Sequence, residues 1–183
     1  MAAASGTRAT RPPRAGAPPH VDPHVRPLTR ADSPFLWTAL YHALHAPPGA
    51  APFSAEAVRE PAVARYAAGW MDRPGDLGVL AEAGGDPVGA AWLRLWPPGE
   101  RGFGWVDAST PELSMAVLPA HRGRGVGTAL LGRLLAEAGR EFDAVSLSVS
   151  PSNPARRLYQ RFGFADVGGP AGGSVVMAKQ LAP

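Results

Sequence analysis

The sequence predicts an α/β domain built on a mixed sheet of about seven strands, with helices on both faces. Three observations indicate this class. Two apolar runs, "LGVLAEA" and "VGAAWLRLW", flank the turn "GGDP" and form an antiparallel hairpin. Strands and helices then alternate through the second half of the chain, which favours parallel pairing as well. No internal repeat is present, and 183 residues suffice for one domain with its own core.

The first half of the chain is expected to contain one short strand and two helical regions. "HVRPL", residues 24–28, is the strand, and Thr29 opens a helix that carries apolar residues on one side up to Leu44. A second helical region, residues 54–71, contains Pro61, which divides or kinks it because proline lacks the N–H that a helix interior needs.

The strands and helices of the second half are predicted from hydrophobic periodicity and from the positions of glycine and proline. The expected elements are, in order, strands over residues 77–83 and 88–96, a long loop over 96–111, a strand over 112–119, a helix ending near Gly139, a strand over 144–150, a helix that Asn153 caps and Gly163 ends, and two final strands.

Composition divides the chain into a tail and a body. Residues 1–24 are rich in Ala, Pro and Arg and lack periodic apolar positions, so they are expected to be disordered, and residues 25–183 form the domain. Four of the 18 basic residues but only one of the 15 acidic residues precede Pro27. The body therefore contains 14 residues of each charge and is formally neutral. A basic face for nucleic acid is therefore not expected.

Other functional classes are excluded by residue usage. There is no cysteine, which removes disulfides and thiolate chemistry, and no apolar run approaches the ~20 residues of a membrane helix. Lys179 is the only lysine beside 17 arginines, a usage typical of a GC-rich genome. We expect a bacterial, cytoplasmic protein.

The stretch "HRGRGVGTALL", residues 121–131, predicts an anion site. A strand leads into a glycine-rich turn and then a helix, so backbone N–H groups point out of the helix N-terminus toward an anion. Arg122 and Arg124 add charge-assisted contacts to phosphate oxygens. A P-loop would require a lysine, and in a G-x-G-x-x-G pattern from Gly123 the third position falls on Thr128, so ATP and NAD fit poorly.

Two motifs give a resemblance to a known family. Arg122-x-x-Gly125-x-Gly127 after "AVLP" resembles the acetyl-CoA signature of the GNAT superfamily of N-acetyltransferases. "NPARRLYQRFGF" is similar to that superfamily's second motif, N-x-x-A-x-x-L-Y-x-x-x-G-F, with Ser152 in the usual asparagine position and Asn153 one residue later. The resemblance covers roughly residues 25–181 and implies the GNAT acyltransferase fold.

The resemblance implies where acetyl-CoA is held. Pantetheine pairs with exposed backbone, like an added strand, and the pyrophosphate lies on the N–H groups of the glycine turn. No metal is implied. The implied cofactor-binding residues are Met115, Ala116, Val117, Arg122, Gly123, Arg124, Gly125, Val126, Gly127, Thr128 and Asn153.

The resemblance also implies two catalytic residues. Tyr159 occupies the position whose hydroxyl supplies a proton to the leaving thiolate; the alternative is a tyrosine that packs its helix on the sheet. Glu112 begins the cofactor strand and accepts the amine proton through water; the alternative is an exposed strand-end carboxylate, with water alone as base.

The expected function is transfer of acetyl from acetyl-CoA to a primary amine, by direct attack in a ternary complex. The amine belongs to a small molecule, a peptide or a protein N-terminus, and a homodimer is compatible with the resemblance. The alternative is an acyl-CoA sensor without turnover. Trp37, Tyr41, Phe53 and Trp105 lie in segments that line the acceptor site of the family, while core packing explains each equally well. His42 and His45 are polar helix positions, with a metal pair as the alternative.

Overall fold

The computed structural model describes residues 23–168 and 173–181, and its strands are β1 (His24–Pro27), β2 (Leu77–Ala83), β3 (Asp86–Arg94), β4 (Glu112–Val117), β5 (Ala144–Val149), β6 (Ala165–Gly168) and β7 (Val175–Gln180). Its helices are α1 (Ser33–Ala43), α2 (Pro61–Ala64), α3 (Val126–Ala138) and α4 (Arg156–Arg161), with short 3-10 turns η1 (Arg30–Asp32), η2 (Ala55–Arg59) and η3 (Pro119–His121).

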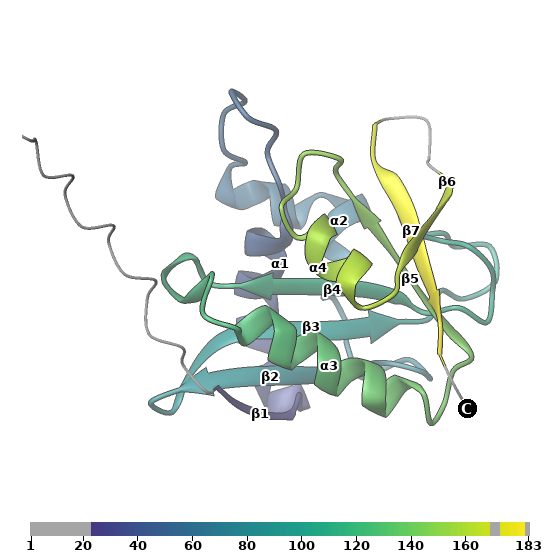
Figure 1. The fold of residues 1–183 in the computed structure, drawn as a ribbon, viewed down its shortest axis with the longest axis horizontal. Coiled ribbons are helices and arrows are strands. Elements are labelled where there is room, and N and C mark those ends of the chain that lie inside the picture. Colours follow the sequence, from purple (N-terminus) through teal and green to yellow (C-terminus); the bar gives the residue numbers. More distant parts are fainter. Residues whose placement is uncertain (1–22, 169–172, 182–183) are drawn as a thin grey trace, which may run out of the picture.

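These seven strands form one mixed sheet in the order β1-β2-β3-β4-β5-β7-β6 (Figure 1). All neighbouring pairs are antiparallel except β4 and β5, which are parallel and share a single paired position, Glu112 with Ser146. The predicted α/β class with a mixed seven-stranded sheet is therefore confirmed.

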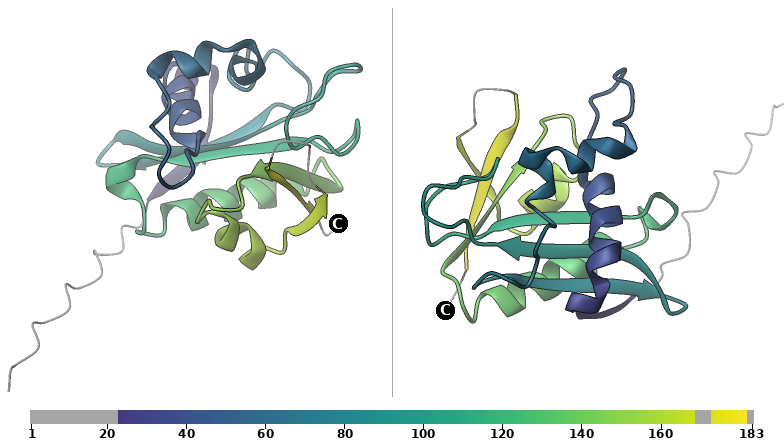
Figure 2. Two further views of the ribbon diagram at one scale, coloured as in Figure 1. Left: turned by 90° about the horizontal axis from the view of Figure 1, so that it is seen from above. Right: turned by 180° about the vertical axis from the view of Figure 1, so that it is seen from behind.

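Helices cover both faces of the sheet, as predicted. Seen from above, α1 and α2 lie on one side of the strands and α3 and α4 on the other (Figure 2). Each face has its own apolar core, because alternate side chains of a strand point to opposite faces. In β3, Ala90 and Trp92 pack with α1, whereas Ala91 and Leu93 pack with α3.

Local details agree with the expected pattern, except at Asn153. The backbone N–H of Thr29 donates to Asp32 Oδ2 at 2.7 Å at the start of the first helical segment. Gly163, with φ +86°, ends α4, and the N–H of Phe164 reaches back to the carbonyl of Tyr159 at 3.1 Å. Asn153 accepts a hydrogen bond from the N–H of Ala155 at 2.9 Å in the turn before α4, but the helix itself begins at Arg156 with Ala155 as its N-cap, so Asn153 is not the cap that was expected.

Three expectations differ in extent from the structure. The second helical region is only η2 and the one-turn α2, because Pro61 removes a donor and starts a new segment. Strand β3 begins and ends two residues earlier than expected, since the pairing with β2 extends to Ala83 and Asp86. β1 begins at His24, and the rest of the expected tail, residues 1–22, lies outside the described residues.

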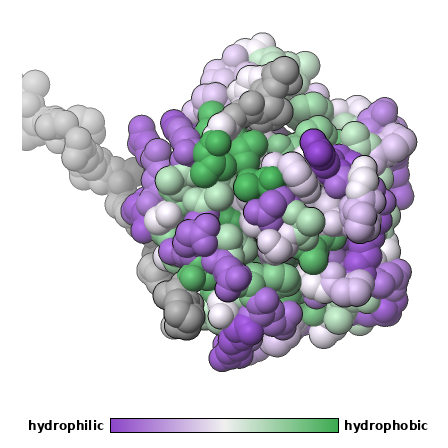
Figure 3. Space-filling view, turned by 90° about the vertical axis from the view of Figure 1, so that its right-hand side faces the viewer, coloured by the Kyte–Doolittle hydropathy of each residue, from purple (hydrophilic) through white to green (hydrophobic). Residues whose placement is uncertain are grey.

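The outer surface is mixed in character. On the face shown in Figure 3, hydrophobic residues gather toward the upper left, and hydrophilic residues lie along the lower edge and the right side. Within residues 23–168 and 173–181, no helix combines the length and the apolar character that a membrane crossing requires.

Candidate active site

The site begins where β4 and β5 separate. Ser146 donates its N–H to the carbonyl of Pro111 at 3.0 Å, and beyond Glu112 no further residue of β4 pairs with β5. On the other edge of β4, Leu118 donates to Val88 of β3 at 2.9 Å. Since backbone polar groups alternate along a strand, the N–H and C=O of Met115 and Val117 point into the gap, and those of Ala116 point toward β3.

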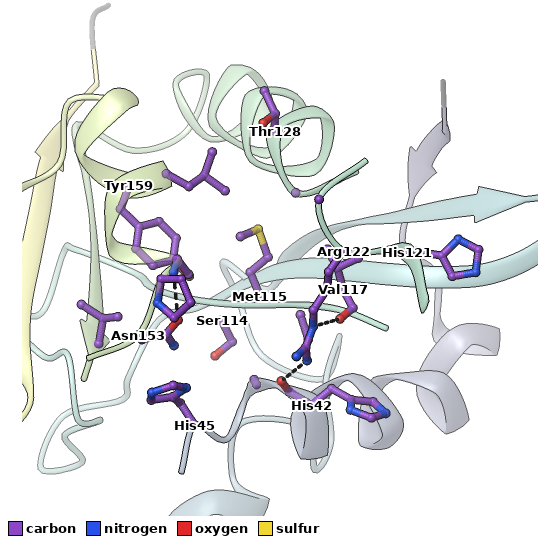
Figure 4. A pocket seen from close by; sticks show the side chains of 18 of the residues that line it. His42, His45, Ser114, Met115, Val117, His121, Arg122, Thr128, Asn153 and Tyr159 are labelled. Atoms are coloured by element: carbon purple, nitrogen blue, oxygen red, sulfur yellow. Dashed lines mark hydrogen bonds between the residues drawn. The ribbon is translucent and has the colours of Figure 1, made fainter. Parts of the chain in front are cut away.

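A cleft of about 680 Å³ fills this gap (Figure 4). It is bounded by β4, β5, the glycine turn, α4 and the C-terminal end of α1. The predicted site residues that line it are Met115, Ala116, Val117, Arg122, Gly123, Gly125, Gly127, Thr128, Asn153 and Tyr159. Arg124, Val126 and Glu112, which were also predicted, do not line it.

The glycine turn adopts the backbone that its sequence requires. Gly123 and Gly125 have φ of +72° and +88°, which only glycine adopts readily, and Gly125 is the N-cap of α3. The first N–H groups of α3 therefore face the cleft without helical partners. Val126 is 1% exposed and packs in the core, so only its backbone is available to a ligand.

Gly127 lies where the helix comes closest to α4. A Cβ at this position would stand 3.4 Å from Leu158 Cδ2 and 3.8 Å from Val117 Cγ2. The absence of a side chain keeps the cleft open between the helix N-terminus and β4. Glycine here preserves space for a ligand that lies against the backbone.

The Arg122 side chain folds back onto β4 and the end of α1, across the opening of the cleft. Its Nε donates to the carbonyl of Val117 at 2.9 Å, and its Nη2 donates to the carbonyl of His42 at 3.4 Å (Figure 4). The guanidinium thus donates to the Val117 carbonyl, one of the backbone acceptors that are left without a strand partner where β4 and β5 separate. The neighbouring His121 also lines the cleft (Figure 4).

His45 extends the wall on the opposite side. Its Nε2 lies 3.1 Å from the hydroxyl of Ser152, on the loop between β5 and α4. This contact joins the end of α1 to the segment that leads into the second motif. No group of three possible metal-ligating side chains is found among the described residues.

Tyr159 projects from α4 into the cleft and is 7% exposed. Its ring packs edge-on against Phe164 at a centroid distance of 5.9 Å. Burial raises the pKa of Tyr159 to about 12, because the phenolate would be poorly solvated. No hydrogen bond to its hydroxyl is present within the described residues, so its proton remains available to a ligand.

Glu112 lies on the other face of the sheet, 3% exposed. Its Oε1 accepts from the hydroxyl of Tyr66 at 2.8 Å and the N–H of Gly104 at 2.7 Å, and its Oε2 accepts from Trp96 Nε1 at 2.8 Å. Burial raises the pKa of the carboxyl, although the three donors act in the opposite direction. The alternative of an exposed strand-end carboxylate is wrong.

Sequence reasoning missed these partners of Glu112. Tyr66 and Trp96 are distant in the chain and looked like ordinary core positions. The available signal was the spacing of Gly102 and Gly104 within "RGFGW": a Cβ at Gly102 would overlap Glu112 Oε2, and one at Gly104 would come within 2.5 Å of the Leu147 carbonyl carbon. Glycines in a long loop mark backbone that approaches another element closely.

Comparisons with known proteins agree with this geometry. The model of the acetyltransferase (GNAT) family matches residues 37–164. A GCN5-like protein acetyltransferase of Mycobacterium tuberculosis is 49% identical over 55 residues, which are 28% of this chain and 26% of that protein, so the similarity spans about a quarter of the relative's length.

Solved structures extend the similarity over most of the chain. An acetyltransferase of Salmonella typhimurium, solved with its cofactor acetyl-CoA, is 25% identical with a TM-score of 0.62, and the match covers 89% of this chain and 96% of that one. A ribosomal-protein-alanine N-acetyltransferase of Brucella melitensis is 26% identical with a TM-score of 0.59, covering 86% and 99%. The motifs, the separated strands and the family match lead to one conclusion: the chain belongs to the GNAT family of acetyltransferases.

Proposed function

We propose that this protein transfers the acetyl group of acetyl-CoA to a primary amine in a ternary complex. The single observation that carries the proposal is the gap between β4 and β5, which opens onto the N-terminus of α3 and contains the Tyr159 side chain. The residue usage of the chain favours a bacterial, cytoplasmic setting for this activity.

The cleft has the chemistry that acetyl-CoA requires. The backbone groups of Met115 and the N–H of Val117, which no strand pairs, offer hydrogen bonds to an extended amide chain, as an added strand would. The N–H groups from Gly123 to Thr128 and the dipole of α3 favour a pyrophosphate. In this arrangement Arg122 exchanges its contacts with Val117 and His42 for phosphate oxygens, which as charged acceptors bind it more strongly than neutral carbonyls.

Acetyl-CoA supplies an activated acetyl thioester with a thiolate as leaving group. Tyr159 then provides the proton for that sulfur, because its raised pKa keeps the phenol protonated throughout the physiological range. We assign removal of the amine proton, through water, to Glu112, whose burial raises its pKa and makes it a stronger base than a solvated carboxylate. The amine would approach from the face of the sheet covered by α1.

An acyl-CoA sensor without turnover is the second candidate. It is favoured by one observation, that Glu112 already accepts three hydrogen bonds and does not line the cleft. A sensor and an enzyme bind acetyl-CoA equally well, so only turnover separates them.

Two measurements test the proposal. Calorimetric titration should show saturable one-site binding of acetyl-CoA, with ATP and NAD as controls that do not compete. Amine-dependent release of free CoA, followed with a thiol reagent, should then separate the enzyme from the sensor. Because the protein contains no cysteine, it adds no background to that assay.

The variant Tyr159→Phe identifies the proton donor. We expect its kcat to fall by about 10²-fold or more, while its affinity for acetyl-CoA changes little, since the ring and its packing against Phe164 are retained. Equal turnover of the two proteins would show that Tyr159 only packs its helix.

A further inference from the structure

Three arginines on the α1 face of the sheet are stacked on tryptophan rings. Their guanidinium carbons lie 4.8 Å from the ring centroid for Arg59 over Trp37, 4.9 Å for Arg65 over Trp96, and 4.2 Å for Arg101 over Trp105. Within residues 23–168 and 173–181, none of the three arginines forms an ion pair.

Arg65 contacts the backbone of the loop that carries Arg101. Nη2 of Arg65 donates to the backbone carbonyl of Arg101 at 2.6 Å, and the Arg65 guanidinium also lies 6.0 Å from the ring centroids of Tyr66 and Phe103. The Arg101 guanidinium makes no hydrogen bond within the described part of the chain. Glu100, its neighbour, is paired with Arg73 at 3.3 Å and does not neutralise it.

The two arginines lie close to the hydrogen-bond partners of Glu112, the proposed base. Two of the rings beneath Arg65, those of Tyr66 and Trp96, donate hydrogen bonds to Glu112. The loop that carries Arg101 continues into Gly104, whose backbone packs against Leu147 and Ser148. Ser148 lines the cleft, so this loop packs against the wall of the cleft at Gly104.

Stacking prepares a guanidinium to bind an anion. An aromatic face fixes the plane of a guanidinium and leaves its remaining N–H groups for a planar partner. In Arg65, Nε donates to the carbonyl of Ala62 at 3.2 Å and Nη2 to that of Arg101, so the Arg101 guanidinium is the one with its N–H groups available. Carboxylates match a guanidinium in geometry and charge. Arg94 differs from Arg101 in this respect, because it is paired with Asp76 at 2.8 Å and both side chains are buried.

We infer that the acceptor is an amine that also carries a carboxylate, and that the guanidinium of Arg101, whose backbone carbonyl accepts from Arg65, binds this carboxylate. The inference rests on the proposed acetyltransferase function and names its substrate class. Free amino acids and the C-termini of short peptides share this chemistry, so both are included in the test.

The test compares each acceptor with its neutral counterpart. The kcat/KM for CoA release is measured with the twenty amino acids and a set of dipeptides, each beside its C-terminal amide. We expect the best carboxylate acceptor to exceed its amide by about tenfold or more, the size of one charge-assisted contact. Preference for amino acids or for dipeptides then identifies the source of the carboxylate.

Arg101→Gln is the informative variant, because Arg101 is exposed and its guanidinium has no other partner in the described residues. It should lose about tenfold in kcat/KM for the carboxylate acceptor and keep its value for the amide. Arg140→Gln is the matched control, since Arg140 is exposed and pairs with Glu137 at the far end of α3. Equal use of acid and amide, or equal effects of the two variants, would overturn the inference.

A binding measurement separates this inference from the proposed function. The N-acetyl forms of the same amino acids and of their amides are titrated calorimetrically, which requires no turnover. Carboxylate-dependent binding that Arg101→Gln weakens supports the arginine site even where no CoA is released, in which case only the enzymatic proposal fails. Turnover of neutral amines alone, with no carboxylate-dependent binding, refutes the arginine site and leaves the acetyltransferase function standing.

Discussion

Replacing Glu112 by glutamine tests the hydrogen-bond network behind β4. The substitution keeps the shape of the side chain and its capacity to accept from Tyr66 and Gly104 at one oxygen. At the other position an NH₂ group replaces Oε2. In the wild type Oε2 accepts from the N–H of Trp96 at 2.8 Å, whereas in the variant the NH₂ group faces that N–H. Two donors then point at one another in a site that is 3% exposed.

The expected cost follows from this single contact. A hydrogen bond to a charged group contributes about 1.5–3 kcal/mol, and a buried donor left without an acceptor costs about 1–3 kcal/mol. Removal of a buried charge offsets part of this loss, since burial raises the pKa of Glu112. We expect a net loss of about 2 kcal/mol in the free energy of unfolding, which lowers Tm by about 4–8 °C in a protein of this size.

Urea denaturation of four proteins measures the effect: the wild type, Glu112→Gln, Trp96→Phe and the double variant. Phenylalanine removes the indole N–H, so the glutamine no longer faces a donor. Glu112→Gln should therefore cost at least about 1 kcal/mol less in the Trp96→Phe background. An equal cost in both backgrounds would refute the assignment of this hydrogen bond.

The same variant has a pH signature. The folded-state pKa of Glu112 lies above its unfolded value, so the stability that its protonated form contributes is present in acid and is lost as pH rises through the folded pKa. The wild type should gain stability relative to Glu112→Gln as pH falls from neutral, and a difference that is independent of pH would contradict the raised pKa. In the activity assay, an unchanged pH–rate profile in Glu112→Gln would show that Glu112 is not the base.

Two further predictions concern the cleft. Because burial raises the pKa of Tyr159 to about 12, its phenol should remain protonated up to pH 10, and a loss of kcat with an apparent pKa near 10 that is absent in Tyr159→Phe would contradict this. Gly127→Ala should fold with unchanged or higher stability, since its Cβ meets Leu158 only at 3.4 Å and alanine favours helix. The methyl group enters the cleft, so acetyl-CoA affinity should fall about tenfold by calorimetry, and an unchanged affinity would place the ligand elsewhere.

The fold and the cofactor side of the site could be predicted because their signals are local. A helix N-terminus preceded by glycines determines where Gly125 and Gly127 lie, and the strand before it determines Met115. Tyr159 follows from the second motif in the same way. Each of these positions depends on residues within about one turn of helix or one strand.

The long-range contacts of the site could not be predicted, because they join distant segments. Tyr66 and Glu112 are 46 positions apart, and Arg122 and His42 are 80 apart. Nothing in the pattern around Arg122 indicates that its side chain folds back onto Val117. Whether a carboxylate at a strand end is buried depends on which loop covers it, and loop paths are not encoded by periodicity.

Glu112 connects the cleft between β4 and β5 with the hydrogen-bond network on the opposite face of the sheet. It is the one residue of β4 that pairs with β5, so the strands separate immediately after it and open the cleft. Its side chain, on the opposite face, accepts hydrogen bonds from the hydroxyl of Tyr66 and the N–H of Gly104. Gly104 belongs to the same loop as Arg101. A carboxylate bound by Arg101 would therefore affect the position of the same loop whose Gly104 N–H donates to Glu112, the proposed base. If the acceptor is acidic, its binding and the deprotonation of its amine should be coupled through Glu112, and Arg101→Gln should then shift the acidic limb of the pH–rate profile as well as lower kcat/KM.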